Sequence, residues 1–445
     1  MRHEITVSIA PTADTRKESA SLALHFPGQS AEVNLDVDGN ALLRVSRTVP
    51  DIAQDFLTIA SCIYAADKAV PRASEDDRWT RHMAIEIPVE HVVTWGAVAA
   101  DIEECIGFLT GDRWEISFRH SEMRLIQKKA RKYWVRERPP KGAAVSLLSG
   151  GLDSFIGAVD WLTSNPGAPL LLVAHYDGDV GGPGQDQRSV GESCLRRFGD
   201  QFEMAQTRIG LATGSTDTSF RSRSLLFIAL GCYFAEILGA NTPVLIPENG
   251  PIALNYPLTP ARRGSCSTRT VHPHFIAGIN RVLARVGSLS PVQNPYELKT
   301  KGEMVSGCLD QDFLEGTFVL TRSCAKFGHR RHWVDRTARS CGICIPCLFR
   351  RASLHASGRD TERYGVKIES FATNSDTPSD LRALVTFLKK NPSDRDIART
   401  LLGNGPFQSD QMVPYVDLIK RMRAEVLVWL RARGSPYLIG EVAGC

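Results

Sequence analysis

The stretch from Val145 to Ser154 constrains the fold of this chain more than any other part of it. Its first four residues, Val145 to Leu148, are small or apolar without helical spacing, which is typical of a buried parallel strand. Two glycines then allow a tight turn and a close approach of the backbone to a ligand. Apolar residues at helical spacing follow, so we expect a helix that begins near Asp153. A strand that turns over Ser-Gly-Gly into a helix N-terminus forms an anion-binding nest.

The side chains of this turn indicate a phosphate site. Hydroxyls of Ser149 and Ser154 lie at its rim, and the Asp153 carboxylate is suited to hold Mg²⁺ against phosphates. The turn is neither a Walker A loop nor Gly-x-Gly-x-x-Gly. Ser-Gly-Gly-x-Asp-Ser instead resembles the PP-loop of the N-type ATP pyrophosphatases, which implies that ATP binds here and loses pyrophosphate. The backbone N–H groups would come from Gly150, Gly151, Leu152 and Ser154. The alternative is an ordinary glycine-rich turn.

Strand and helix patterns alternate after this turn, which predicts an α/β fold with a doubly wound parallel sheet and ligands at the carboxyl ends of the strands. The expected strands are 170–174, 202–209, 244–247 and 317–320, and the expected helices are 221–238 and 271–286. Residues 1 to about 120 predict an extra N-terminal α/β unit without a catalytic constellation, and the pattern from Arg359 onward is helical. We therefore expect three units: 1–140, 141–360 and 361–445.

The composition of the chain argues against a membrane protein and excludes few other classes. No apolar run is long enough to span a membrane and no signal peptide precedes the first strand, so we expect a cytoplasmic protein without membrane contact. A net charge of +4 over 445 residues argues neither for nor against nucleic acid. Eight basic residues nevertheless crowd between Arg124 and Lys141. That segment is either a phosphate or RNA contact beside the ATP site, or a solvated linker helix.

Four of the eleven cysteines form a second motif: Cys324, Cys341, Cys344 and Cys347. Three thiolates on one tight knuckle plus a fourth from a loop suit tetrahedral zinc in a closed, structural site. An iron–sulfur cluster is the alternative, although the residues after Cys347 lack the Cys-Pro of a bacterial ferredoxin run. The loop held by this motif is rich in basic residues, which either face phosphates or are solvated: Arg322, Lys326, Arg330, Arg331, Arg336, Arg339, Arg350 and Arg351.

Together the two motifs are similar to those of the 7-cyano-7-deazaguanine synthase (QueC) family of PP-loop enzymes. The second motif reads Ser-Cys, then Ser-Cys-Gly-x-Cys-x-x-Cys-x-x-Arg; residues 300–305 resemble the family's Thr-Lys-x-Glu segment, and residues 223–227 its Arg-Asn-x-x-Phe helix start, with Ser replacing Asn. The resemblance covers about residues 143–360 and departs at 175–185, 248–251 and 263–270, where the base pocket would differ. The N-terminal unit and helical tail look more like the QueC-like proteins of bacterial anti-phage systems (Qat and a class of CBASS).

The resemblance implies adenylation of a carboxylate by ATP, that of 7-carboxy-7-deazaguanine, followed by amide formation with ammonia or an amine of a partner protein from the same defence operon. Lys301 and Arg223 would stabilise charge on the phosphates, with Asp153 and Ser154 completing the catalytic set. Two alternatives stay open: a PP-loop enzyme that adenylates a base in tRNA, and a non-catalytic subunit that senses ATP.

The remaining candidate residues follow the predicted strands. Glu248 and Asn249 end one strand and are candidates to hydrogen-bond a purine-like edge. Arg269 and Thr270 are candidates to hold the substrate carboxylate, and His175, at the end of the neighbouring strand, to contact ATP.

Overall fold

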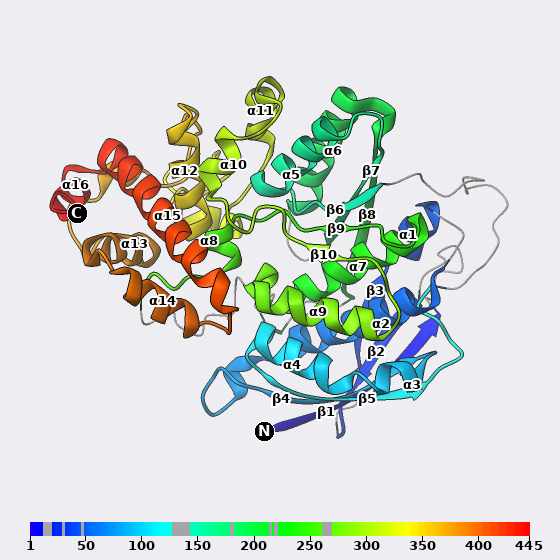
Figure 1. Cartoon of the computed structure of the whole chain (residues 1–445). Coiled ribbons are helices and arrows are strands. Elements are labelled where there is room, and N and C mark those ends of the chain that lie inside the picture. The colour runs from blue at the N-terminus through cyan, green and yellow to red at the C-terminus, as the bar shows by residue number, and fades with distance from the viewer. Residues whose placement is uncertain are drawn as a thin grey trace.

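The computed structural model describes residues 1–11, 20–28, 32–45, 49–126, 143–178, 182–212, 216–217, 221–259 and 269–445. The molecule is a mixed α/β protein built on a ten-stranded, mostly parallel sheet, with a C-terminal group of helices beside it (Figure 1). The sheet has the strand order β10-β9-β6-β7-β8-β3-β2-β1-β4-β5. Of the basic segment predicted between Arg124 and Lys141, residues 127–141 lie outside the described residues.

Five parallel strands form the half of the sheet that carries the glycine turn: β6 (Ala144–Leu147), β7 (Leu170–Tyr176), β8 (Phe202–Leu211), β9 (Val244–Leu245) and β10 (Val292–Gln293). In chain order their arrangement from β8 to β10 is 3-2-1-4-5. The chain therefore leaves β6 for β7 on one side and later returns to β9 on the other. In open α/β sheets, ligands bind at such a switch point, beyond the carboxyl ends of the two central strands. Here those strands are β6 and β9.

Alternate residues of these strands build two separate cores. Leu170, Leu172 and Ala174 of β7 pack beneath α5 (Leu152–Ser164) and α6 (Pro183–Phe198), while Leu171 and Val173 point to the opposite face. That face is covered by α7 (Arg223–Leu238) and α9 (Pro273–Arg285) (Figure 1). The apolar residues of the parallel strands are buried on both faces, as the sequence predicts.

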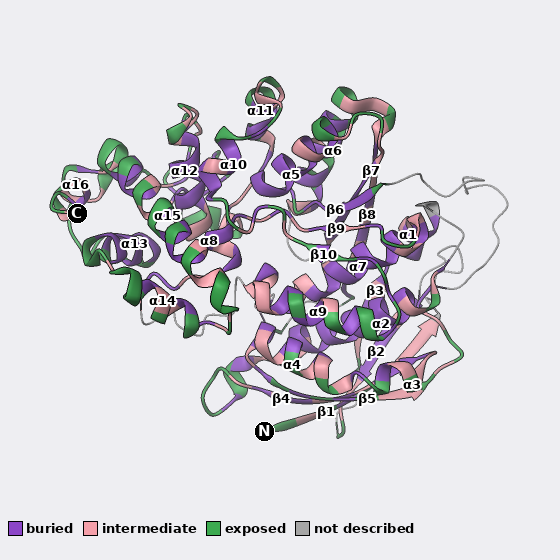
Figure 2. Cartoon of the chain, viewed as in Figure 1, coloured by how far each residue is buried: buried purple, intermediate pink, exposed green. Residues whose placement is uncertain are grey.

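The N-terminal unit continues the same sheet. It contributes β1 (Arg2–Pro11), β2 (Ala20–His25), β3 (Val33–Val37), β4 (His82–Val89) and β5 (Arg113–His120), with helices α1 (Gly39–Val45), α2 (Asp51–Ala69), α3 (Val92–Gly96) and α4 (Ala99–Thr110). Strand β3 pairs antiparallel with β8, and Leu35 lies opposite Leu211. One hydrophobic core spans both halves, so the sheet is unbroken where the sequence predicts a change of unit. Figure 2 shows α2 buried along most of its length.

A buried charge network joins the N-terminal unit to α7. The guanidinium of Arg81, which is completely buried, lies between the carboxylates of Asp67 and Asp112. Arg72 donates two hydrogen bonds of 2.7 Å to Asp112, and Asp67 accepts from the hydroxyl (2.6 Å) and backbone N–H (3.0 Å) of Ser222. Ser222 immediately precedes α7, so the network sets where that helix begins against the N-terminal unit.

The C-terminal half is helical, as predicted from residue 359 onward. Its helices are α8 (Gly250–Ala253), α10 (Lys301–Ser306), α11 (Gln311–Thr317), α12 (Ile345–Ala356), α13 (Ser379–Lys390), α14 (Asp394–Leu402), α15 (Met412–Arg433) and α16 (Pro436–Glu441). Residues of α12 to α16 share one core of their own, and their outer surfaces are exposed (Figure 2). Among the described residues, none of the helices has both the length and the apolar character that crossing a membrane requires.

The strand expected at residues 317–320 is wrong. Thr317 ends α11, and Phe318–Leu320 forms a 3-10 helix. The carbonyls of these residues accept from arginine side chains instead of from a neighbouring strand: Phe318 O from Arg350 (2.9 Å), and Val319 O from Arg339 (2.6 Å). The last strand of the sheet is β10, a two-residue strand that the sequence does not predict.

Candidate functional site

The predicted strand, glycine turn and helix are present as β6, residues 148–151 and α5. Gly150 has a φ of +86°, a conformation in which glycine carries no steric penalty. The hydroxyl of Ser154 donates to Gly151 O (3.1 Å) and accepts from the N–H of Ser149 (3.2 Å), and the Ser149 hydroxyl accepts from the N–H of Gly151 (3.2 Å). The two serines therefore hold the loop in shape. The first N–H groups of α5 have no acceptor within the helix and lie at the positive end of its dipole.

The glycine loop is packed closely against two other segments. A Cβ on Gly150 would lie 3.3 Å from the Cβ of Asp186 in α6, and a Cβ on Gly151 would lie 3.2 Å from the Ser149 hydroxyl. The N–H of Arg322 donates to Gly150 O at 2.9 Å. The loop thus lies between α6 and the segment that leads to the four cysteines.

Four predicted site residues meet at the start of α5. The Lys301 ammonium, from the first residue of α10, forms an ion pair with Asp153 Oδ1. The other carboxylate oxygen accepts from the side chain (2.6 Å) and backbone N–H (3.2 Å) of Asn249. The Asn249 amide also donates to Glu248 Oε1 at 3.1 Å. Both side chains of the ion pair are less than 10% exposed, at 8% and 7%. Loops that follow β6 and β9, together with α10, thus build one compact charged group at the switch point.

The electrostatics around Asp153 favour a single negative charge shared between two carboxyl groups, those of Asp153 and Glu248. Burial alone would raise the pKa of Asp153, but the Lys301 ammonium, together with hydrogen bonds from Glu248 and Asn249, holds the pKa below its usual range. Burial and the neighbouring Asp153 carboxylate raise the pKa of Glu248 well above its usual range. One ammonium therefore neutralises one carboxylate, and the second carboxyl favours its neutral form.

A carboxylate of the C-terminal group holds α10 in place. The Glu425 side chain, from α15, accepts from the Thr300 hydroxyl (2.7 Å) and from the N–H of Gly302 (3.1 Å). These donors are at the N-terminus of α10, next to Lys301. Burial raises the pKa of Glu425 to about 7. The helical tail thus helps to position the lysine that contacts Asp153.

His175 and Arg223 form a second pair at the end of β7. The His175 ring is fully buried; its Nε2 bonds to Ile209 O (2.8 Å), and its Nδ1 faces Arg223 Nε at 3.5 Å. Arg223 also donates to His175 O at 3.1 Å. Burial, with Arg223 nearby, lowers the pKa of His175 to about 3, so the ring is neutral. The structure thus joins these two predicted residues to each other and not to Asp153.

A contact between the N-terminal unit and the end of β7 is not predicted from the sequence. Lys68 of α2, completely buried, pairs with Asp177 Oδ2 at 3.1 Å, and the Tyr64 hydroxyl donates to the same oxygen at 3.1 Å. Burial would raise the pKa of Asp177, but Lys68, with Arg223 also nearby, lowers it. The available signal was α2 itself, because a helix buried around most of its circumference places its few polar side chains inside the molecule.

Arg269 and Thr270 belong to a short 3-10 helix, Arg269–Val271. The guanidinium of Arg269 donates to Phe108 O (2.8 Å) and lies over the Phe108 ring, 4.6 Å from its centroid. The structure therefore places Arg269 against the N-terminal unit, and not in the group around Asp153.

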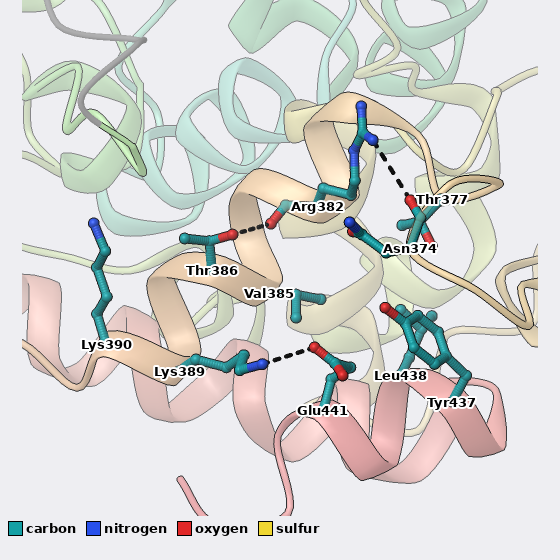
Figure 3. Close-up of a pocket in the computed structure, with 10 residues that line it drawn as sticks. All are labelled: Asn374, Thr377, Arg382, Val385, Thr386, Lys389, Lys390, Tyr437, Leu438 and Glu441. Carbon is teal, nitrogen blue, oxygen red and sulfur yellow. Dashed lines mark hydrogen bonds and ion pairs between the residues drawn. The ribbon is translucent and has the colours of Figure 1, made fainter.

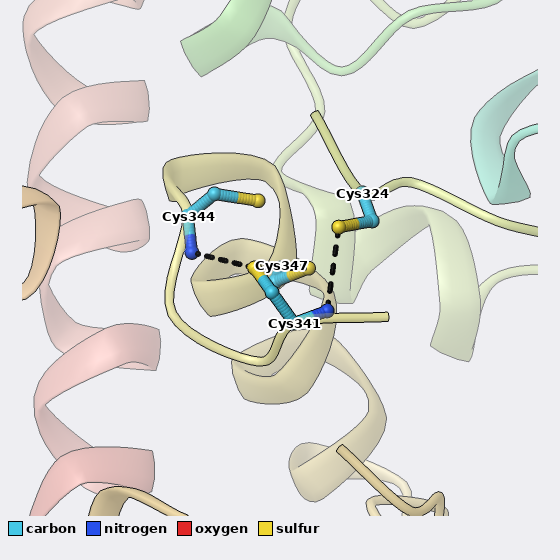
Figure 4. A group of neighbouring side chains, drawn as sticks. All are labelled: Cys324, Cys341, Cys344 and Cys347. Carbon is cyan, nitrogen blue, oxygen red and sulfur yellow. Dashed lines mark hydrogen bonds between the residues drawn. The ribbon is translucent and has the colours of Figure 1, made fainter. Parts of the chain in front are cut away.

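The four cysteines predicted to bind metal do come together (Figure 4). All four are buried, and their Sγ atoms lie within 4.8 Å of one another. Cys341 Sγ and Cys347 Sγ are 3.8 Å apart, which matches the edge of a tetrahedron with zinc–sulfur bonds of about 2.3 Å. Backbone N–H groups also point at the sulfurs: that of Cys341 donates to Cys324 Sγ at 3.3 Å, and that of Cys344 to Cys341 Sγ at 3.3 Å. The set can hold zinc with no position left for water.

The knuckle that carries three of these cysteines depends on a glycine. Gly342 has a φ of +80°, and a Cβ there would lie 2.7 Å from the Cβ of Tyr364. A larger residue would move the knuckle away from Tyr364 and open the cluster.

Three of the basic residues around the cysteines are held by carboxylates, in two different settings. Arg350, fully buried, donates to Glu362 (2.7 Å) and to Thr321 (2.8 Å), so its role is structural. Arg322 and Arg339 instead converge on a single carboxylate, which belongs to Asp186 beside the glycine loop. From the sequence, the basic residues of this loop either contact phosphates or are solvated.

Cavities in the described residues also occur away from the glycine loop. One of about 460 Å³ lies between α13 and α16 and is lined by Arg382, Lys389, Tyr437 and Glu441 among others (Figure 3). Lys389 and Glu441 pair across it at 2.8 Å. None of its lining residues belongs to the groups around Asp153, His175 or the cysteines.

The fold and the site define an α/β protein with a glycine loop and a charged group at the switch point of its parallel strands, and with a four-cysteine cluster beside them. Comparisons with protein-family models, with curated proteins and with solved structures find no match for the chain.

Proposed function

We propose that this protein is an ATP-dependent enzyme that adenylates a carboxylate, releases pyrophosphate and transfers the acyl group to an amine. The observation that carries the proposal is the glycine loop at the switch point, with Lys301 held by Asp153 at the N-terminus of α5. A helix N-terminus favours anions, and an ammonium beside it adds to that preference.

The residues around the glycine loop are of a kind suited to bind a chain of phosphates. At Gly151 a Cβ would crowd the Ser149 hydroxyl, and the backbone of this residue is extended rather than left-handed, with φ −86° and ψ 168°. The glycine is therefore not required by the backbone conformation. Its use leaves room for a ligand to approach the loop.

The proposed chemistry makes a poor acyl donor into a good one. A carboxylate oxygen attacks the α-phosphorus of ATP, the bond to the bridging oxygen breaks, and pyrophosphate leaves with that oxygen. An amine nitrogen then attacks the acyl carbon, AMP leaves, and the nitrogen loses its proton. Positioning and charge stabilisation supply most of such catalysis. Lys301 is our candidate to neutralise the charge that develops on the phosphates.

Magnesium would be held by the carboxylate of Asp153, which supplies the hard oxygens that this ion prefers. Both oxygens of Asp153 already have partners, Lys301 and Asn249, so ion binding there requires Lys301 to move. No step above depends on the ion. Zinc in the four-cysteine cluster would fix the adjoining loop and take no part in the reaction.

The resemblance of the sequence to QueC-like proteins supplies the candidate substrates. The carboxylate would be that of 7-carboxy-7-deazaguanine, and Glu248 and Asn249 are our candidates to contact a purine-like edge. The amine would be ammonia or an amine of a partner protein in an anti-phage system.

The test is pyrophosphate release from ATP by the zinc-loaded chain, with 7-carboxy-7-deazaguanine and ammonia, followed by mass spectrometry of all products. Gly151→Ala should lower the rate by at least about 100-fold, because the added Cβ would crowd the Ser149 hydroxyl and displace the preorganised donors of the loop. The matched control is Gly440→Ala in α16, where an added Cβ meets nothing within 4 Å. Equal rates for both variants would contradict the proposed site. ATP binding without pyrophosphate release would favour the ATP-sensing subunit instead.

A further inference from the structure

We propose that Arg322 and Arg339 bind the pyrophosphate end of the nucleotide, and that metal in the four-cysteine cluster positions both of them. This inference rests on the proposed function. It adds two phosphate-binding residues and gives the cysteine cluster a role in nucleotide binding.

Both arginine side chains donate hydrogen bonds to the same carboxylate, that of Asp186. Arg322 Nε donates to Asp186 Oδ2 at 2.6 Å, and Arg339 Nη2 donates to Asp186 Oδ1 at 2.6 Å. Two guanidinium charges face one carboxylate charge, so one positive charge is left over. A pair with surplus positive charge is suited to an anion with several oxygens, because guanidinium groups bind phosphates in a bidentate manner.

The pair lies beside the glycine loop. Asp186 is in the first turn of α6, where its Cβ would be 3.3 Å from a Cβ on Gly150. The backbone of Arg322 contacts the loop directly, since its N–H donates to Gly150 O at 2.9 Å. Arg322 therefore lies against the loop that would hold the phosphates, and Arg339 is linked to the same side of the loop through Asp186 in α6.

The two arginines differ in freedom to move. The Arg322 side chain is 8% exposed and stacks over Phe327, 4.7 Å from the ring centroid. The Arg339 side chain is 43% exposed, although it also donates to Val319 O (2.6 Å) and Leu320 O (3.0 Å). Arg339 is therefore the one that can turn from Asp186 towards an incoming phosphate.

The cysteine cluster fixes the distance between them. Arg322 precedes Cys324 by two residues, and Arg339 precedes Cys341 by two residues. The segments already touch through the N–H of Cys341, which donates to Cys324 Sγ at 3.3 Å. A metal bound to both sulfurs would lock the two segments, and hence the two arginines, at the glycine loop. Metal and pyrophosphate should then strengthen each other's binding by the same factor.

The experiment measures binding of inorganic pyrophosphate to the full-length, zinc-loaded chain by calorimetry. Arg339→Gln should weaken binding by about 10- to 100-fold, as expected for the loss of charged hydrogen bonds. The matched control is Arg336→Gln, an exposed arginine three residues earlier in the same loop, which should bind as the wild type does. Circular dichroism and the melting temperature verify that each variant is folded.

A second measurement tests the coupling without any catalytic readout. Competition with a chromophoric chelator gives the zinc affinity with and without pyrophosphate, after the zinc bound by free pyrophosphate is subtracted. Pyrophosphate should tighten zinc binding in the wild type and not in Arg339→Gln. If the wild type binds no pyrophosphate, the proposed function fails. If the wild type and Arg339→Gln bind it equally, this inference fails while the proposed function stands. Arginine-dependent binding with unchanged zinc affinity would overturn the role given to the metal.

Discussion

Removal of the Lys301 ammonium should destabilise the protein strongly, because it leaves Asp153 buried without a cation. Both side chains of the pair are almost inaccessible to solvent. Loss of one partner from a buried ion pair costs about 3–5 kcal/mol of the free energy of unfolding. The hydrogen bonds from Asn249 remain, and a proton can bind between Asp153 and Glu248, so we expect Lys301→Met to lie at the low end, at about 3 kcal/mol.

The double variant Asp153→Asn/Lys301→Met should recover most of this loss, because neither charge remains buried. The two single costs should together exceed the cost of the double variant by at least about 2 kcal/mol, because directly contacting residues are coupled. The cost of Lys301→Met should also be smaller near pH 5 than near pH 8. Without the ammonium, burial raises the pKa of Asp153, the native state binds the extra proton, and stability falls as the pH rises.

The assay is urea-induced unfolding followed by circular dichroism, with Lys389→Met as the control. Lys389 pairs with Glu441 at the surface, where its side chain is 50% exposed, so its loss should change stability little. A cost below about 1 kcal/mol for Lys301→Met, or additive single costs, would show that Asp153 and Lys301 form no buried pair.

Three further predictions concern the metal and two titrating groups. The purified chain should carry one zinc ion, and Cys344→Ser should lower both zinc occupancy by native mass spectrometry and the melting temperature; full occupancy in the variant would contradict a four-thiolate site. Because His175 stays neutral down to about pH 3 while an unfolded histidine protonates near pH 6.5, stability should fall as the pH drops from 7 to 4. His175→Gln should flatten that fall in urea titrations, and an unchanged slope would argue against a buried neutral ring. The Glu425 carboxyl has a pKa of about 7 in the native state and about 4.3 when unfolded, so stability should fall as the pH rises from 5 to 7. Glu425→Gln should remove this fall in thermal melts, and the same pH dependence in the variant and the wild type would refute the prediction.

The parts of the site that the sequence predicts are those set by local signals. The glycine turn between an apolar strand and a helix is at Gly150, as expected, because backbone freedom and strand burial are written into adjacent residues. The cysteine cluster follows in the same way from the spacing of three cysteines on one knuckle. Glu248, Asn249 and Lys301 meet Asp153 because the ends of parallel strands share one edge of the sheet.

The remaining contacts depend on partners that are remote in sequence. Lys68 reaches Asp177 because α2 is buried between the N-terminal strands and α7; the sequence of α2 indicates burial but does not specify which residue Lys68 meets. The apolar run at Phe318 looks like a strand, but two arginines further along the chain take its carbonyls. Arg269 likewise contacts the N-terminal unit, where its partner is the carbonyl of Phe108.

The pairing of β3 with β8 has a consequence for how the chain is made. Translation completes β3 long before β8, so the nascent N-terminal strands expose an unpaired edge until the later strand leaves the ribosome. Contacts between residues so far apart in sequence slow folding, and unpaired strand edges can pair with other chains. A version cut between the two strands would carry one open edge on each fragment, and the fragments would need to be produced together to escape aggregation.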